Sequence, residues 1–308
     1  MNYGRDFLIG KKNERRINDD DDILYNVFSL KFVFILFATL SIIFTFTACN
    51  KWQDWEQILG NKGSNNPSTN TQETQNKPVV NPKPEPLLSP GEYNLTAPKA
   101  NVPFIVYLPL DYVPDHSFPV IFCYHGLGGT ATTWPFSQVT HGKGFIIVGM
   151  NYSSQATEHL GLEFVRFERA LFLETLQMVS ARLNIDQKLI FMGGYSQGGY
   201  STSLLGEQVI DKLAGLIILG AGRYAVDHYP PLPRSIRGKP IFIGVGQNDN
   251  VHNPRARLAA NTYLGWGANV TFEEWAGVGH GINTPEFPSK KMLPWLEDIA
   301  AKRQKSDG

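Results

Sequence analysis

The sequence has few cysteines and no excess of charge of either sign. Only two cysteines, Cys49 and Cys123, occur among 308 residues, which excludes a small fold stabilised by several disulfides. Lysine plus arginine and aspartate plus glutamate both total 28, and no basic stripe with interleaved aromatic residues is present. Because nucleic-acid-binding domains typically carry such a stripe, we expect no nucleic-acid partner.

The two cysteines lie in unrelated contexts. Cys123 falls within the continuous apolar run Phe118–Tyr124, where a free thiol behaves as a small buried hydrophobe. Cys49 directly follows the apolar segment Phe32–Ala48. We therefore expect no disulfide between them.

The segment Phe32–Ala48 carries no charge and ends in Thr-Ala before Cys49. It resembles a bacterial lipoprotein signal peptide, which is cleaved before a cysteine that becomes lipidated. The resemblance implies an exported bacterial protein with a lipidated Cys49, anchored to a membrane on the periplasmic or cell-surface side. An uncleaved transmembrane anchor is the alternative, because the apolar run is near the lower length limit for crossing a bilayer.

These features divide the chain into four parts. Residues 1–29 form a charged preface that signal peptides seldom carry, and a hypothesis is that translation begins at position 30. Residues 30–48 are the signal peptide or anchor. Residues 49–90 start with the lipidated cysteine and continue into a linker rich in Asn, Thr, Gln, Ser and Pro, which cannot bury enough apolar surface to fold. Residues 91–305 form one globular domain.

Apolar runs of strand length alternate with helix-period segments across this domain. Such alternation predicts an α/β fold with a doubly wound, mostly parallel sheet covered on both faces. No internal repeat is found. The predicted strands are Val102–Leu108, Phe118–Tyr124, Phe145–Met150, Leu189–Met192, Leu216–Leu219, Pro240–Val245 and Val270–Trp275, and the predicted helices are Leu162–Leu183, Ser201–Ile210, Arg255–Leu264 and Lys290–Lys302.

The most informative motif is Gly-x-Ser-x-Gly at Gly194–Gly198, between a strand-like and a helix-like segment. A sharp strand-to-helix turn lifts a serine hydroxyl clear of the sheet and sets it at the positive end of a helix. The pattern predicts Ser196 as a catalytic nucleophile. A glycine-rich loop with a buried or capping serine is the alternative.

A serine nucleophile needs a general base, and the base needs an orienting acid. Asp249 follows the predicted strand Pro240–Val245, and His280 lies between glycines after Val270–Trp275. Both loops leave the sheet at the edge where Ser196 is expected. We interpret Asp249 as the acid and His280 as the base, and His252 follows Asp249 too closely in sequence to serve. An Asx-turn aspartate and a surface or core histidine are the alternatives.

Backbone amides are needed to stabilise the oxyanion of the tetrahedral intermediate. The glycine-rich loop His125–Gly129 follows the strand Phe118–Tyr124 and can turn amides inward, and Gln197 can supply a second amide from the first turn of the helix. A plain glycine turn or a phosphate cradle is the alternative. No Gly-Lys-Ser/Thr follows the loop and no acidic metal ligand is evident, so we expect no metal and no cofactor.

Together these residues resemble the α/β-hydrolase family over about residues 101–301. Within it they are similar to small serine esterases of the polyhydroxybutyrate-depolymerase, feruloyl-esterase and dienelactone-hydrolase kind. The resemblance implies Ser196 as nucleophile, Asp249 as acid, His280 as base, and Leu127 and Gln197 as the oxyanion amides. It also implies a compact fold with little or no lid. Dienelactone hydrolases proper use a cysteine, so that activity is not expected.

The expected function is a membrane-tethered hydrolase of carboxylic esters that works as a monomer. Its substrate would be an ester linked to a polysaccharide or a small aryl or acyl ester, and its N-terminus would contact the lipid membrane. Trp134, Tyr152 and Tyr224 are candidates for the substrate pocket, together with Phe136. Acyl transfer or peptide cleavage by the same triad, or a binding protein on an inactive hydrolase scaffold, are the alternatives.

Overall fold

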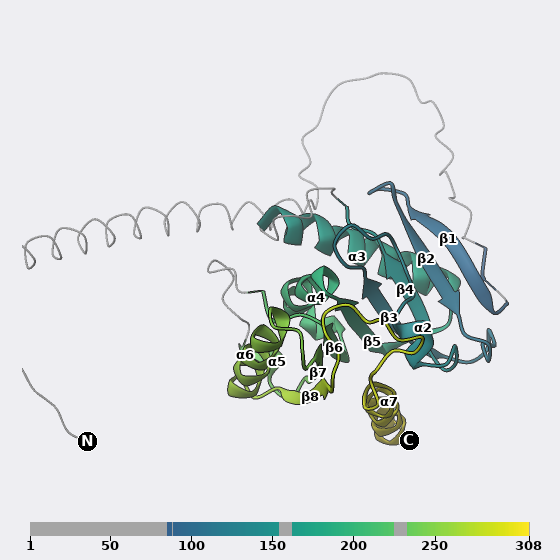
Figure 1. Ribbon diagram of the computed structural model, residues 1–308. Helices are drawn as coiled ribbons and strands as arrows, with labels where there is room; N and C mark the ends of the chain where they lie inside the picture. Colours follow the sequence, from purple (N-terminus) through teal and green to yellow (C-terminus); the bar gives the residue numbers. More distant parts are fainter. Residues whose placement is uncertain (1–84, 88, 154–161, 225–232, 308) are drawn as a thin grey trace, which may run out of the picture. The chain divides into compact units, whose positions relative to one another are not determined.

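The computed structural model describes residues 85–87, 89–153, 162–224 and 233–307 (Figure 1). The chain divides into two compact units, 1–78 and 79–308, and every described residue belongs to the second. The predicted signal peptide or anchor, Cys49 and nearly all of the linker lie outside the described residues. None of the helices in the described ranges is both long enough and apolar enough to cross a membrane.

An eight-stranded sheet forms the centre of the described unit, in the order β1-β2-β4-β3-β5-β6-β7-β8. The strands β1 and β2 run antiparallel to their neighbours, and the pairs from β4 to β8 are parallel. The doubly wound, mostly parallel sheet predicted above is confirmed. The strands are β1 (Gly91–Ala97), β2 (Val102–Leu108), β3 (Phe118–Tyr124), β4 (Ile146–Met150), β5 (Ile185–Tyr195), β6 (Gly215–Leu219), β7 (Pro240–Gly246) and β8 (Asn269–Trp275).

Helices cover both faces of this sheet (Figure 1). Side chains of α3 (Leu162–Arg182), α4 (Gln197–Gln208) and α6 (His252–Gly265) share one apolar cluster with alternate strand residues such as Phe122. The cluster on the other face joins the remaining strand residues to α2 (Phe136–Val139) and α7 (Met292–Asp307). Two short elements complete the described chain, the 3-10 turn η1 (Ile210–Lys212) and α5 (Pro233–Ile236).

The thiol of Cys123 lies inside the second cluster and is fully buried, as the apolar run of β3 predicts. Burial raises the pKa of this thiol well above its ordinary value, because the charged thiolate is poorly solvated there. Cys123 is a free cysteine and acts as a core residue.

The sheet topology brings four loops to one edge. Strands β3 and β5 are parallel neighbours with Tyr124 opposite Gly194, and β7 and β8 are parallel neighbours with Gly246 opposite Trp275. The loops that follow these strands therefore leave the sheet at its carboxyl edge, where ligands bind in open α/β sheets. These loops contain His125–Gly129, Ser196, Asp249 and His280.

Candidate functional site

Ser196 occupies a strained turn between β5 and α4. Its backbone has φ 57° and ψ −120°, a region that residues other than glycine rarely adopt and that persists only when the surroundings hold it. The Ser196 amide donates to the carbonyl of Leu219 over 2.8 Å, and the Ser196 carbonyl accepts from the amide of Gly199 over 2.9 Å. The turn is therefore fixed on both sides, with its hydroxyl at the N-terminus of a 12-residue helix.

The flanking glycines allow this turn because the two limbs touch. A Cβ atom on Gly194 would lie 2.5 Å from the backbone carbon of Gly198, and one on Gly198 would overlap the backbone of Tyr124. No side chain larger than hydrogen fits at either position without moving β3 or α4. The glycines of the motif are required by close backbone approach.

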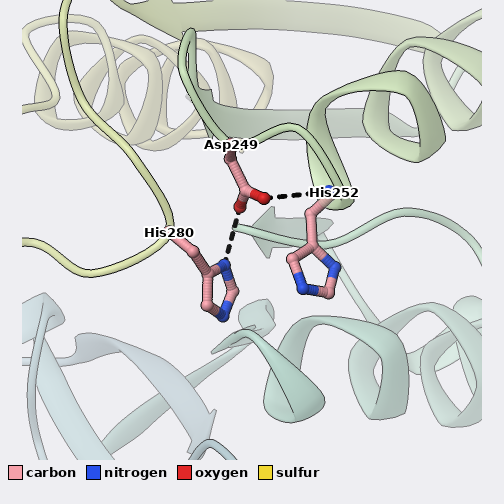
Figure 2. A group of neighbouring side chains, drawn as sticks. All are labelled: Asp249, His252 and His280. Carbon is pink, nitrogen blue, oxygen red and sulfur yellow. Dashed lines mark hydrogen bonds and ion pairs between the residues drawn. The ribbon is translucent and has the colours of Figure 1, made fainter.

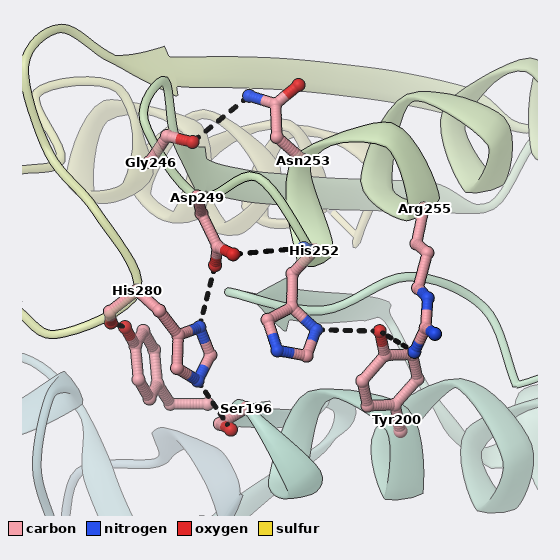
Figure 3. A network of polar contacts seen from close by, with 9 residues as sticks. Ser196, Tyr200, Gly246, Asp249, His252, Asn253, Arg255 and His280 are labelled. Atoms are coloured by element: carbon pink, nitrogen blue, oxygen red, sulfur yellow. Dashed lines mark hydrogen bonds and ion pairs between the residues drawn. The ribbon is translucent and has the colours of Figure 1, made fainter.

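Ser196, His280 and Asp249 form one line of hydrogen bonds (Figure 3). Ser196 Oγ lies 2.9 Å from His280 Nε2, and His280 Nδ1 lies 2.7 Å from Asp249 Oδ2. A carboxylate can only accept, so Nδ1 donates to it and Nε2 is left to accept from the serine. Asp249 is 3% exposed, and its other oxygen accepts the backbone N–H of His252 over 2.9 Å.

Two aromatic rings pack against the His280 imidazole. The Tyr195 ring stacks on it at 5.5 Å between centroids, and the His252 ring lies at 4.2 Å. The Tyr195 hydroxyl also donates to the carbonyl of His280, and burial raises the pKa of this phenol to about 12, which keeps the donor protonated. The orientation of His280 is thus fixed by its ring contacts as well as by Asp249.

The loop after β3 passes close to Ser196. A Cβ atom on Gly126 would be 3.6 Å from Cβ of Ser196, and the loop closes on itself through a bond of 3.1 Å from the Gly129 amide to the Gly126 carbonyl. Leu127 and Gln197 line the same cavity as Ser196. The two residues predicted to supply oxyanion amides therefore lie at one site with the serine.

An open cavity of about 830 Å³ lies over these residues. Its lining includes Tyr224 but neither Trp134 nor Tyr152, the other two candidates for the substrate pocket. A second hollow of about 800 Å³ lies elsewhere, at the starts of β5, β7 and β8 beside α7, and its lining includes none of Ser196, Asp249 and His280. The cavity over Ser196 is lined by Gly126, Leu127, Tyr195, Ser196, Gln197, Tyr200, Tyr224, His252, His280, Gly281 and Ile282.

The other candidate aromatic residues pack around the site. Trp134 packs edge-on against Tyr195 and Phe287, and Phe136 is completely buried in the same cluster. Tyr152 donates its hydroxyl to the carbonyl of His125 over 2.9 Å, which braces the loop after β3. An aromatic residue near a motif in sequence can line the cavity or pack in the core, and its position in the sequence does not distinguish the two.

Three side chains at this site could approach a metal ion together. Donor atoms of Asp249, His252 and His280 lie within 4.8 Å of one another (Figure 2). However, each Asp249 oxygen already accepts a hydrogen bond, one from each histidine residue. An ion bound to Asp249 Oδ2 or His280 Nδ1 would displace the proton that joins them, so the observed contacts are those of a hydrogen-bonded dyad.

Comparison with known proteins gives similarity at the level of structure alone. No protein-family model and no curated protein matches the sequence. Esterase 2 of Thermogutta terrifontis, phosphonylated by cyclosarin, matches with a TM-score of 0.50 and 18% identity over 71% of this chain and 95% of that one. This chain has the α/β-hydrolase fold.

Two further solved structures are similar to a lesser degree. An acetyl xylan esterase from Aspergillus awamori has a TM-score of 0.48 and 14% identity, with 67% of this chain and 99% of that chain covered. A thermostable esterase has a TM-score of 0.46 and 18% identity over 70% of this chain, and the match spans 62% of that esterase's own length.

The candidate site includes residues that the sequence analysis did not select. Tyr195 lies inside the serine motif and Tyr200 lies two residues after it, and this nearness to Ser196 in sequence could have indicated both. His252 was set aside because it follows Asp249 by three residues, yet the first turn of α6 returns its ring to His280. Nearness in sequence does not prevent two side chains from sharing a site when a helix begins between them.

A buried carboxyl group lies behind the loop that Tyr152 braces. Glu168 is fully buried on α3, and its Oε1 accepts from the amide and the hydroxyl of Ser153, over 2.6 and 2.5 Å. Its Oε2 has no hydrogen-bond partner among the described residues. Burial raises the pKa of Glu168 from 4.5 to about 7, and the bonds from Ser153 oppose that rise.

This raised pKa predicts a pH-dependent stability. The folded state binds a proton at Glu168 between pH 4.5 and about 7 that the unfolded state has released. The stabilisation is therefore complete below pH 4.5 and is lost as the pH rises through about 7. The lost free energy of unfolding is at most about 3 kcal/mol. In Glu168→Gln this contribution to the pH dependence of the free energy of unfolding should be absent.

Urea unfolding at several pH values between 4.5 and 8 measures the effect. The wild-type free energy of unfolding should fall across this range more steeply than that of Glu168→Gln. Glu92→Gln, which removes an exposed carboxyl group on β1, is the matched control and should keep the wild-type slope. Equal slopes in the wild type and Glu168→Gln would contradict the assignment.

Proposed function

We propose that this protein is a serine hydrolase that cleaves carboxylic esters and is tethered to a membrane by its N-terminus. The observation that carries the hydrolase proposal is the line of hydrogen bonds from Ser196 through His280 to Asp249 at the wall of an open cavity. A serine hydroxyl is a weak nucleophile alone and becomes reactive when a positioned imidazole accepts its proton.

The proposed reaction has two steps. Ser196 Oγ attacks the ester carbonyl while its proton passes to His280 Nε2, and the backbone amides of Leu127 and Gln197 stabilise the oxyanion. The carbon–oxygen bond to the alcohol then breaks, and the alcohol oxygen takes the proton from His280. Water, deprotonated by the same imidazole, attacks the acyl-enzyme, and its proton returns to Ser196 as the acid leaves. Asp249 stabilises the imidazolium in both steps.

The tether rests on sequence features alone. The uncharged segment Phe32–Ala48 precedes Cys49, and a linker rich in proline and polar residues separates Cys49 from the domain. A lipidated cysteine followed by such a linker would hold the domain at a membrane surface with its cavity free to meet large substrates.

A fluorophosphonate probe tests both the serine hydrolase and the membrane tether, on the full chain produced in bacteria. Phosphonylation of Ser196, located by peptide mass spectrometry, is expected in the membrane fraction. The intact mass of the labelled protein should be that of a chain that begins at a lipid-modified Cys49. A chain without any adduct at Ser196 would favour a binding protein on an inactive scaffold, and a mass that still includes Phe32–Ala48 would favour an uncleaved anchor.

A further inference from the structure

A second histidine, His252, lies beside His280 and has no part in the proposed proton path. It starts α6, its ring lies at 4.2 Å from the His280 ring, and it lines the cavity over Ser196. Its side chain is partly exposed, so it can meet a ligand. The chemistry of this position depends on which of its two ring nitrogens carries a proton.

The neighbours of His252 favour one position for that proton (Figure 3). Arg255 Nη1 lies 3.4 Å from the hydroxyl oxygen of Tyr200, and this oxygen lies 2.8 Å from His252 Nδ1. A guanidinium group can only donate, so the Tyr200 oxygen accepts from it and its single hydrogen is free to point to Nδ1. Nδ1 then accepts, and the neutral imidazole carries its proton on Nε2.

The charges around His252 favour this neutral form. Burial is the largest cause that lowers its pKa, and a proton on His280 and the positive charge of Arg255 each lower it further, while Asp249 acts in the opposite direction. A neutral His252 with Nδ1 held by Tyr200 is a fixed hydrogen-bond donor, because only its Nε2–H remains to be satisfied.

This donor stands on the side of the cavity where the alcohol of an ester would leave. In the proposed reaction the leaving oxygen takes its proton from His280 Nε2, so the alcohol portion must lie next to His280. In Figure 3 the nitrogen of His252 that does not face Tyr200 lies on the edge of the ring turned toward His280. Two other hydroxyl groups at the cavity are already engaged, that of Tyr195 by the carbonyl of His280 and that of Tyr200 by His252.

We infer that His252 is a specificity-determining residue that donates its Nε2–H to an acceptor oxygen on the alcohol portion of the substrate. The preferred esters are those whose alcohol carries an ether or hydroxyl oxygen close to the ester oxygen. Tyr200 is a positioning residue that holds His252 in the donating form. The inference rests on the proposed function, since it requires an ester to be cleaved at Ser196.

A pair of esters that differ in one atom tests the inference. 2-Methoxyethyl acetate has an ether oxygen where n-butyl acetate has a methylene, so their kcat/KM ratio reports on an acceptor at that position. In His252→Phe, which keeps an aromatic ring against His280 and removes the donor, this ratio should fall about 5-fold from its wild-type value, as expected for one neutral hydrogen bond. The comparison between proteins cancels the different reactivity of the two alcohols.

Two further variants make the outcome decisive. His252→Asn retains an N–H donor and should keep part of the wild-type ratio. Tyr200→Phe removes one hydroxyl from a partly exposed ring and lets the proton of His252 move to Nδ1, so the ratio should fall by a smaller factor. An unchanged kcat/KM ratio in His252→Phe would overturn the inference about His252 and leave the proposed function standing. If His252→Phe does not fold, an unchanged ratio in Tyr200→Phe has the same meaning. A wild type that cleaves neither ester would overturn the proposed function, and this inference with it.

Discussion

Replacement of Ser196 by alanine is expected to lower the turnover of p-nitrophenyl acetate by about 10³-fold or more. The variant keeps the cavity, the residues that would supply the oxyanion amides and the His280–Asp249 pair, and it loses the hydroxyl oxygen that lies 2.9 Å from His280 Nε2. Initial rates measured on matched protein concentrations, with circular dichroism to verify folding, give the comparison.

The control for this experiment is a serine elsewhere in the fold. Ser180 lies on α3, and its hydroxyl donates to the carbonyl of Leu176 over 2.7 Å, so Ser180→Ala removes a hydroxyl without touching the cavity. Its turnover should stay within about twofold of wild type, because surface changes distant from a site have small effects. Unchanged turnover in Ser196→Ala would refute the nucleophile.

Asp249→Asn is expected to lower kcat by about 10³-fold or more while KM changes little. The two oxygens of Asp249 accept from His280 Nδ1 and from the His252 amide. An asparagine has only one oxygen, and when it accepts from His252 its NH2 group faces His280. Nδ1 must then accept, the proton moves to Nε2, and the imidazole can no longer take the proton of Ser196.

A second aspartate serves as the matched control. Asp298 is exposed on α7 and pairs with Lys302, so Asp298→Asn removes the same charge without reaching the cavity. A loss of less than tenfold in Asp249→Asn would mean that the ring contacts of His280, rather than this carboxylate, set the tautomer and orientation of the base.

The strands could be predicted from sequence where apolar residues follow one another without interruption. The predicted limits of Val102–Leu108 and Phe118–Tyr124 agree with β2 and β3. β5 is longer than predicted, since it extends from Ile185 to Tyr195 through polar and glycine residues that carry no apolar signal. Pairing with β3 on one side and β6 on the other continues the strand into these residues.

Elements at the edges of the fold could not be found in this way. β1 was missed because it alternates between exposed and partly buried residues along Gly91–Ala97, as expected of an antiparallel strand at the sheet edge. The helices α2 and α5 have four residues each, which is too short for a helical period to appear. The conformation of such elements is determined by the residues that they contact in the folded domain, and not by a pattern in their own sequence.

The sequence by itself determined the order of strands and helices and the turn chemistry at Gly194–Gly198, because apolar periodicity and glycine requirements act over a few neighbouring residues. It also placed Ser196, Asp249 and His280 at the ends of three predicted strands, which became β5, β7 and β8. Only the tertiary structure decided that Ser196 and His280, 84 positions apart, lie 2.9 Å from each other, and that His252 rather than Trp134 or Tyr152 lines the cavity. Those relations depend on which strands become neighbours and on which face of each element is covered, and both are set by the packing of the whole domain.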